Sequence, residues 1–233
     1  MQERITWYKG PRERPYSRRE LAADTVAHAI GIVLAIAANV GLVSRLLTYR
    51  PPLLITSCVL LYGFSIIAMI TLSAIFNTGQ AHWGHRRPAL RSADHAGICL
   101  MIAGTNTPFM ATVCTTNELA FCWAVGLLAI LARASRGCCD VALVHVSAFL
   151  LMGWSCMSVW EQIQQAFSPW ACNMLLTGGS LYTIGLIPWL MKPVEFHISV
   201  WHAFVIVAGE DLCSTLRTSR SLALTVTGAA LNH

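Results

Sequence analysis

Long apolar segments recur along the chain, and each is close to the about 20 residues that a helix needs to cross a bilayer. We place them at about Leu21–Leu46, Leu53–Phe76, Asp94–Cys114, Leu119–Ala134, Val141–Trp160, Cys172–Met191 and from Phe196 onward. A spanning helix satisfies its own backbone hydrogen bonds, whereas a β-barrel would show alternating segments of about 10 residues. The sequence therefore predicts an all-α fold, a polytopic seven-transmembrane-helix bundle.

The composition agrees with an integral, multi-pass membrane protein. Of the 233 residues, 55% are hydrophobic and only 12% are charged, which is too little charge to coat a soluble domain of this size. Most of the nine cysteines lie singly in apolar segments, so we interpret them as packing residues rather than as disulfides. We expect membrane lipids as partners and no nucleic acid.

The basic residues predict how the chain is oriented. We divide it into a basic segment (1–20), a membrane domain (21–216) and a divergent tail (217–233). With seven spans, the side of the N-terminus also holds the connections after the second, fourth and sixth spans. That side collects Arg4, Lys9, Arg12, Arg14, Arg18, Arg19, Arg86, Arg87, Arg91, Arg133, Arg136 and Lys192, against Arg45, Arg50, Arg217 and Arg220 on the other. The positive-inside rule places the N-terminus in the cytoplasm.

Polar side chains gather at the ends of four predicted spans. The groups are Asp24 with His28, Ser73 with Asn77, Asp94 with His95, and His197 with His202. Spans one, three and seven begin on the cytoplasmic side and span two ends there, so all four groups fall at one depth. Imidazoles, a carboxylate and a hydroxyl at one depth are the components of a zinc-type site, and ionisable groups in membranes are functional candidates.

Each group also has a structural interpretation. Asp94 is suited to charge the N-terminus of a helix, and Ser73 and Asn77 are residues that commonly join helices in membranes. For His28 we favour a hydrogen bond to a neighbouring helix over metal ligation. His145 has no partner in the sequence, and we assign it to packing.

Several stretches then resemble one known family. The closest is Asp94-His-Ala-Gly-Ile-Cys-Leu-Met-Ile-Ala-Gly-Thr-Asn-Thr-Pro108-Phe109, and Ser73-Ala-Ile-Phe-Asn77 looks like a Ser-x-x-x-His motif. The segment from Glu20 to Gly31, Met152-Gly153-Trp154, the glycines from Gly178 to Gly185, and Trp201-His202-Ala-Phe-Val205 follow in order. From about Glu20 to Gly209, the chain resembles the hemolysin III-like proteins of the progestin and adipoQ receptor (adiponectin receptor-like) family.

This resemblance implies a seven-helix fold with zinc near the cytoplasmic face, bound by three histidines. It implies a zinc-dependent hydrolase acting on a ceramide-like lipid amide, because zinc activates water and polarises a carbonyl group. By the resemblance, Asp94 and Ser73 are the catalytic residues, Asp94 holding the water and Ser73 supporting the site. His202, His197 and Asn77 correspond to the metal-ligand positions.

Two departures from the family pattern leave a second function open. Asn77 stands where the family has histidine, and His197 and His202 are five residues apart rather than four. In a helix, four positions set side chains about 40° apart and five set them about 140° apart, so His197 needs a non-helical entry or a bulge. Ile198 occupies the family's histidine position. The alternative is therefore a metal-poor, non-catalytic receptor or lipid-binding protein.

The last predicted span is also irregular. Its apolar run from Phe196 to Gly209 is short for a span, and Glu210 and Asp211 follow it. Either this helix continues to about Leu216 with two acidic residues facing the bundle, or the last helix is compromised.

Overall fold

The structure is a computed structural model that describes residues 17–79, 87–135, 140–191 and 193–218, and all regular structure in these residues is helical. The helices are α1 (Arg18–Tyr49), α2 (Leu53–Thr78), α3 (Arg87–Thr112), α4 (Thr116–Ser135), α5 (Ala142–Gly153), the short 3-10 helix η2 (Ser155–Val159), α6 (Trp160–Ala166), α7 (Pro169–Leu190) and α8 (His197–Thr218). The all-α fold class is thereby confirmed. The basic segment up to residue 16 and the tail from residue 219 lie outside the described residues.

The long helices overlap the predicted spans, and four segments meet the length and hydropathy of a membrane span. Among the described residues, α1, α2, α4 and the run Ala142–Ala166 are long and apolar enough to cross a membrane. Helix α8 continues through Glu210 and Asp211 to Thr218, which agrees with a complete last helix rather than a compromised one. The fifth segment changes to 3-10 geometry after Gly153, where Asn106 and Ser155 donate hydrogen bonds to the carbonyl group of Met152.

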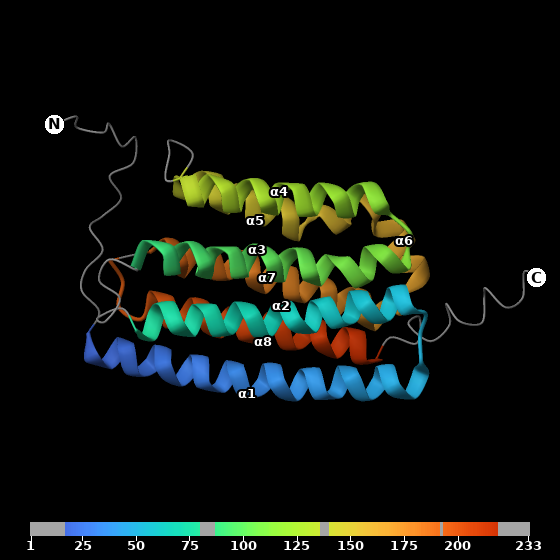
Figure 1. Cartoon of the computed structure of the whole chain (residues 1–233), viewed down its shortest axis with the longest axis horizontal. Helices are drawn as coiled ribbons and strands as arrows, with labels where there is room; N and C mark the ends of the chain where they lie inside the picture. Colours follow the sequence, from blue (N-terminus) through green and yellow to red (C-terminus); the bar gives the residue numbers. More distant parts are fainter. Residues whose placement is uncertain (1–16, 80–86, 136–139, 192, 219–233) are drawn as a thin grey trace, which may run out of the picture.

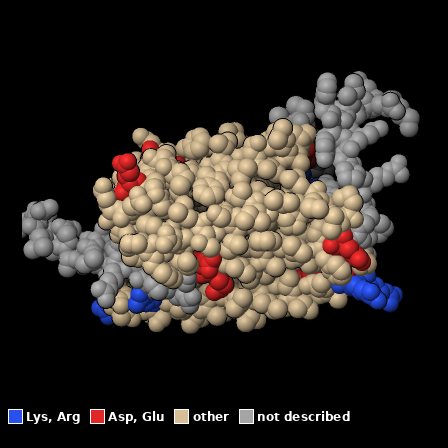
Figure 2. Space-filling view, turned by 180° about the vertical axis from the view of Figure 1, so that it is seen from behind, with Lys and Arg blue, Asp and Glu red and all other residues tan. Residues whose placement is uncertain are grey.

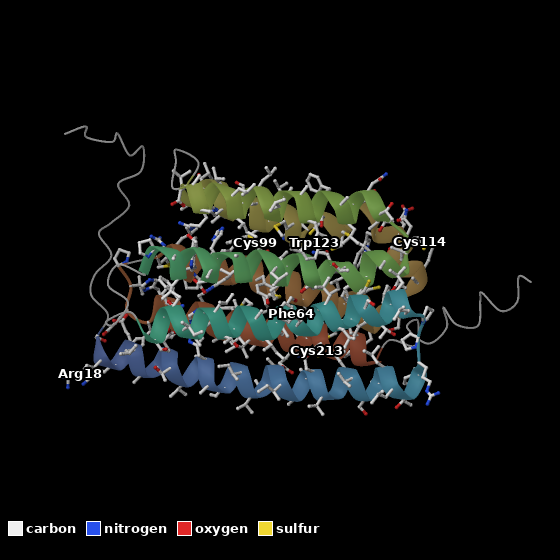
Figure 3. All side chains as sticks on the ribbon, in the orientation of Figure 1. Arg18, Phe64, Cys99, Cys114, Trp123 and Cys213 are labelled. Atoms are coloured by element: carbon white, nitrogen blue, oxygen red, sulfur yellow. The ribbon has the colours of Figure 1, made fainter. Side chains whose placement is uncertain are left out.

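The helices lie side by side along the long axis of the molecule (Figure 1). Helix α2 packs against α1 and α3, α8 packs against α1 and α7, and α4 covers α3 on the far side from α1. Helices α1, α3 and α8 begin at the same end of the bundle, and α2 ends there. We call this end the site end; Arg18 lies there, and Cys114 lies at the opposite end (Figure 3).

The outer surface suits a lipid environment. Large apolar side chains point outward along α1 at Val26, Val33, Val40 and Leu47, the last 71% exposed. In Figure 2, uncharged residues cover most of the face, and lysine and arginine are seen only toward its ends. Such a continuous apolar surface is rare on soluble proteins but is required of helices that contact lipid.

Glycines let the inner helices approach closely. A Cβ atom at Gly185 of α7 would lie 2.9 Å from the Cβ atom of Phe204 in α8, and one at Gly97 of α3 would lie 3.1 Å from the Cα atom of Met69 in α2. Small residues at such crossings are typical of membrane bundles, where close packing and interhelical hydrogen bonds hold helices together. The hydroxyl group of Tyr62 in α2, for example, donates to the carbonyl oxygen of Gly209 in α8 at 3.1 Å.

Candidate metal and catalytic site

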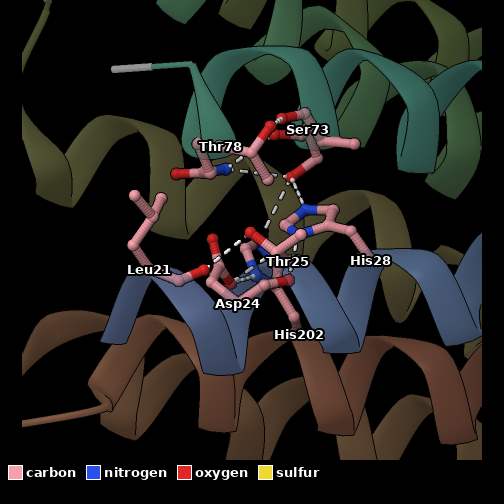
Figure 4. A network of polar contacts seen from close by, with 9 residues as sticks. Leu21, Asp24, Thr25, His28, Ser73, Thr78 and His202 are labelled. Atoms are coloured by element: carbon pink, nitrogen blue, oxygen red, sulfur yellow. Dashed lines mark hydrogen bonds and ion pairs between the residues drawn. The ribbon is translucent and has the colours of Figure 1, made fainter. Parts of the chain in front are cut away.

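Three helices bring four polar side chains together at the site end. Asp24 and His28 come from α1, Ser73 from α2 and His202 from α8 (Figure 4). All four are buried, and Asp24 is fully buried. Asp24 and His28 face the same way because four residues nearly complete one helical turn. The prediction that these groups share one depth is confirmed for this set.

Hydrogen bonds connect the four side chains in sequence. The Nδ1 atom of His202 lies 2.5 Å from Oδ1 of Asp24, and its Nε2 atom lies 3.2 Å from Oγ of Ser73. On the other side of Ser73, Nε2 of His28 also lies 3.2 Å from Oγ. His28 closes the network with its Nδ1 atom 2.8 Å from the carbonyl oxygen of Asp24. The hydrogen bond from His28 to a neighbouring helix, which the sequence favoured, is thus present.

The partners of the two rings assign their protons. A carbonyl oxygen and an ionised carboxylate only accept hydrogen bonds, so Nδ1 of His28 and Nδ1 of His202 carry hydrogen and donate. In the neutral rings both Nε2 atoms then hold lone pairs, and both face the hydroxyl group of Ser73, whose single hydrogen can be donated to only one of them. This is the tautomer found in metal-bound histidines, whose second nitrogen donates to a carboxylate or a backbone carbonyl.

Asn77 and Asp94 complete the surroundings of Ser73. The Nδ2 atom of Asn77 donates to the carbonyl oxygen of Ser73 at 3.0 Å and to its Oγ atom at 3.1 Å. Asn77 therefore joins the site as a hydrogen-bond donor rather than as the metal ligand that the family pattern implies. Asp94 forms a side-chain hydrogen bond with Ser73 and interacts electrostatically with His202 and Asp24, and its buried Oδ1 atom has no hydrogen-bond partner.

His197 does not join the cluster. It is the first residue of α8, and its Nδ1 atom lies 2.8 Å from the carbonyl oxygen of Val194. Neither a non-helical entry nor a bulge separates it from His202, so the two imidazoles stay on different faces of the helix. The placement of His197 as a ligand beside His202 is not found in this structure.

The donor set is nevertheless suited to a metal ion. Asp24, His28 and His202 offer one carboxylate oxygen and two imidazole nitrogens, all within 4.8 Å of one another. Three such protein ligands with one position left for water or substrate are the usual composition of a catalytic zinc site. The unpartnered Oδ1 atom of Asp94 and the Oδ2 atom of Asp24, also without a partner, support the fit because buried carboxylate oxygens rarely stay unpaired.

Glu20 fixes the start of α8 relative to α1. It forms a capping box with Ser17 at the start of α1, and its Oε1 atom accepts a hydrogen bond from the backbone N–H of Phe196 at 3.0 Å. Phe196 has a φ angle of 60°, which is unfavourable for a large side chain. The hydrogen bond holds this turn in place, and the turn sets where His202 meets Asp24.

His95 belongs to a second polar cluster between α3, α4 and α5. Its ring packs against that of His145 with centroids 4.3 Å apart. The Nε2 atom of His145 lies 3.0 Å from Oδ1 of Asp140, which also pairs with Arg133 at 2.7 Å. The assignment of His145 to simple packing is therefore wrong, because it has a hydrogen-bond partner, Asp140, five residues earlier in the sequence.

Part of this arrangement was visible in the sequence. Asp94 and His95 are adjacent, so their side chains point about 100° apart on a helix and cannot both face one site. Asp24 and His28 share a face and lie at the right depth, but the sequence alone does not indicate that this face turns toward α8. The missing information was the rotation of α1, which brings Asp24 to His202 across 178 residues of chain.

Comparisons with known proteins agree with this architecture. A sequence model of the family described as "Haemolysin-III related" matches residues 19–209. A "Hemolysin-3 homolog" of Bacillus subtilis (strain 168) is 27% identical over 201 residues, which cover 82% of this chain and 90% of the relative. A "Hemolysin-3" of Bacillus cereus is 26% identical over 196 residues, which cover 81% of this chain and 86% of the relative.

Proposed function

The chain belongs to the haemolysin-III related family of integral membrane proteins, and we propose that it hydrolyses an acyl bond of a membrane lipid at the Asp24–His28–His202 site. The observation that carries the proposal is the convergence of two imidazoles and a carboxylate on the hydroxyl group of Ser73 inside an apolar bundle. Buried ionisable groups are costly in a membrane protein, and their clustering supports a function rather than packing alone.

We propose zinc as the cofactor, bound by His202, His28 and Asp24 in place of the histidine set that the family pattern implies. Zinc would lower the pKa of a bound water and polarise the substrate carbonyl. The protein side chains have separate roles: the free carboxylate oxygen of Asp94 accepts a proton, and the Asn77 amide holds Ser73 in place by donating to its carbonyl oxygen and to Oγ.

The substrate class follows from where the site lies. The cluster is near one end of helices whose outer faces are apolar, so a substrate with a hydrocarbon chain and a carbonyl group near the headgroup level has the right length and polarity. A ceramide-like amide has these properties. We further propose that all seven segments span the membrane with the N-terminus and the site end in the cytoplasm, as the distribution of basic residues predicts.

The first measurement is zinc per chain, by elemental analysis of detergent-purified protein. We expect close to one zinc in the wild type and little in the His202→Ala variant. His197→Ala is the matched control, because His197 lies on the same helix outside the cluster and its Nδ1 atom is hydrogen-bonded to the carbonyl oxygen of Val194. Ceramide hydrolysis is measured on the same samples, and Asp94→Asn is expected to slow it by about 100-fold or more.

The outcomes separate the two functions considered from the sequence. Zinc at one per chain, lost in His202→Ala and kept in His197→Ala, together with ceramide cleavage, supports the hydrolase. Zinc loading without cleavage contradicts the hydrolase and leaves a metal-binding receptor. A wild type without zinc contradicts the metal assignment and favours the metal-poor relative that Asn77 first suggested.

A further inference from the structure

The second polar cluster, formed by His95, Arg133, Asp140 and His145, contains buried nitrogen atoms that have no hydrogen-bond partner. These atoms are Nε2 of His95, Nε of Arg133 and Nδ1 of His145, and they are three of the six such side-chain atoms among the described residues. The three residues are 4%, 9% and 0% exposed. Because buried polar groups are nearly always hydrogen-bonded, three unpartnered nitrogens in one cluster indicate a polar guest molecule.

The three nitrogens come from three helices that meet at the site end. His95 is near the start of α3, Arg133 near the end of α4 and His145 near the start of α5, and these ends lie together in Figure 1. The two imidazole rings are 4.3 Å apart between centroids, and Arg133 acts electrostatically on both. None of these residues is a ligand of the proposed zinc site, so the two sites can be occupied together.

The charges around the cluster favour an anion over a cation. Arg133 is always charged, and Arg91 acts electrostatically on Arg133 and on both histidines. Asp140 pairs with Nη1 of Arg133 at 2.7 Å, and Asp94 also acts on Arg133 while its side chain is hydrogen-bonded to Ser73. Two guanidinium groups therefore act on a pair of imidazoles that has one bonded carboxylate. A metal ion is repelled from this position, and a negatively charged group is attracted to it.

The hydrogen-bonding capacity of the nitrogens indicates the kind of anion. Nε of Arg133 can only donate, and the ion pair with Asp140 uses Nη1, so the Nε–H remains for another acceptor. Nε2 of His145 donates to Oδ1 of Asp140 at 3.0 Å, so its Nδ1 atom accepts in the neutral ring and donates in the protonated ring. A phosphate monoester has terminal oxygens that accept and, when protonated, a hydroxyl group that donates. It thus matches the cluster with either form of His145.

The position of the cluster indicates where such a phosphate comes from. The cluster lies at one end of helices whose outer faces are apolar, which is the depth of lipid headgroups in a bilayer. Asp140 is 22% exposed, so the cluster is open at the edge of the bundle. Basic pockets between transmembrane helices on the cytoplasmic side are known binding sites for anionic headgroups.

We propose that the second polar cluster binds a phosphate monoester group between α3, α4 and α5, with Arg133 as the principal donor. The guest supplies the missing hydrogen-bond partners of His95, Arg133 and His145. The proposal does not rest on the proposed hydrolase, because it uses none of the zinc ligands. Binding is therefore expected to persist after zinc is removed.

The test measures binding of dioleoyl phosphatidic acid to the full chain, purified in a maltoside detergent, by native mass spectrometry. Dioleoylglycerol is the matched lipid because it lacks only the phosphate group. We expect the phosphatidic acid to bind with and without a metal chelator, and dioleoylglycerol not to bind. Inorganic phosphate is added as a competitor: displacement of the lipid assigns the site to the free ion, and retention assigns it to the headgroup.

Variants of the ion pair identify the binding residues. Arg133→Gln should weaken phosphatidic acid binding by at least about tenfold, because a hydrogen bond to a charged group is lost. Asp140→Asn keeps Arg133 and removes a negative charge, so its affinity should be equal or higher. Arg18→Gln is the matched control, since Arg18 is an exposed arginine at the same end on α1 and outside the cluster, and its affinity should be unchanged.

The double variant Arg133→Gln/Asp140→Asn removes both charges of the pair, so no buried charge is left unpaired if the single variant fails to fold. Circular dichroism confirms that each variant remains helical. Affinity lost in Arg133→Gln and in the double variant, but kept in Arg18→Gln and Asp140→Asn, supports the site. Equal affinity in Arg133→Gln and Arg18→Gln, weaker binding in Asp140→Asn, or equal binding of dioleoylglycerol overturns the proposal and leaves the cluster a structural one.

Discussion

At the scale of single residues, the chemistry of the site depends on what faces the hydroxyl group of Ser73. Two imidazole nitrogens and one amide nitrogen lie within 3.2 Å of it, from His28, His202 and Asn77. A histidine at position 77 would compete for a metal ion, whereas asparagine only donates to Ser73. The residue at position 77 therefore decides whether α2 offers a metal ligand or only a hydrogen-bond donor to Ser73.

Restoring the family histidines should therefore raise metal affinity. Residues 198 and 202 are four apart on α8, so a histidine at position 198 lies on the same face as His202. We expect the Asn77→His/Ile198→His variant to bind zinc more tightly than the wild type by at least about tenfold, since added protein ligands replace water. Competition against a fluorescent zinc chelator measures the change.

The matched control places the same histidine on a different face. Asn77→His combined with Val200→His adds an imidazole at an exposed position two residues from His202, where it points away from the cluster. An equal gain in both double variants would contradict the assigned geometry.

At the scale of helices, the sequence located the elements but not their rotation. Hydropathy located the long helices among the described residues, four of which are long and apolar enough to cross a membrane, but it did not indicate the break of the fifth segment into α5, η2 and α6. It also placed Asp24, Ser73 and His202 at one depth, since depth follows from position along a span. In the structure α3 is rotated so that Asp94 faces the site and His95 faces His145. This rotation depends on packing between helices, and no local sequence pattern encodes it.

The contact between α1 and α8 gives a prediction at this scale. Glu20→Ala removes the capping box of α1 and the hydrogen bond to Phe196, so we expect a loss of about 2–4 kcal/mol in the free energy of unfolding. Ser17→Ala removes only the side-chain cap on α1 and should cost about 1 kcal/mol. Unfolding in detergent, followed by circular dichroism, measures both.

Glu161 provides the control for removing an acidic residue from a first helical turn. It is exposed in the first turn of α6, and Glu161→Ala is expected to change stability by less than about 0.5 kcal/mol. If Ser17→Ala and Glu20→Ala cost the same, the hydrogen bond to Phe196 contributes nothing and α8 is held by packing alone. A larger cost for Glu20→Ala should be accompanied by weaker zinc binding, because the same hydrogen bond positions His202.

At the scale of the whole molecule, the two ends of the bundle differ in chemistry. The site end holds the two polar clusters described above, whereas large apolar side chains such as Val59, Phe109 and Ile163 pack together farther along the bundle. Arg133 and Asp140 also lie at the site end, where an ion pair at the edge of the bundle closes the second cluster. Among the described basic residues that predict a cytoplasmic face, Arg18 and Arg133 thus lie at the end where the proposed chemistry takes place.

Cys114 allows the orientation to be tested. Among the described cysteines it is the exposed one, and it lies at the end opposite to Arg18, so the predicted topology places it outside the cell. With Cys138 and Cys139 changed to serine, intact cells should be labelled by a membrane-impermeant maleimide at Cys114, and Cys114→Ser should abolish the signal. Adding Ser135→Cys to Cys114→Ser moves the thiol to an exposed position at the site end. That variant should react only after the membrane is permeabilised, and the opposite pattern would place the hydrolytic site outside the cell, where it would act on the outer leaflet.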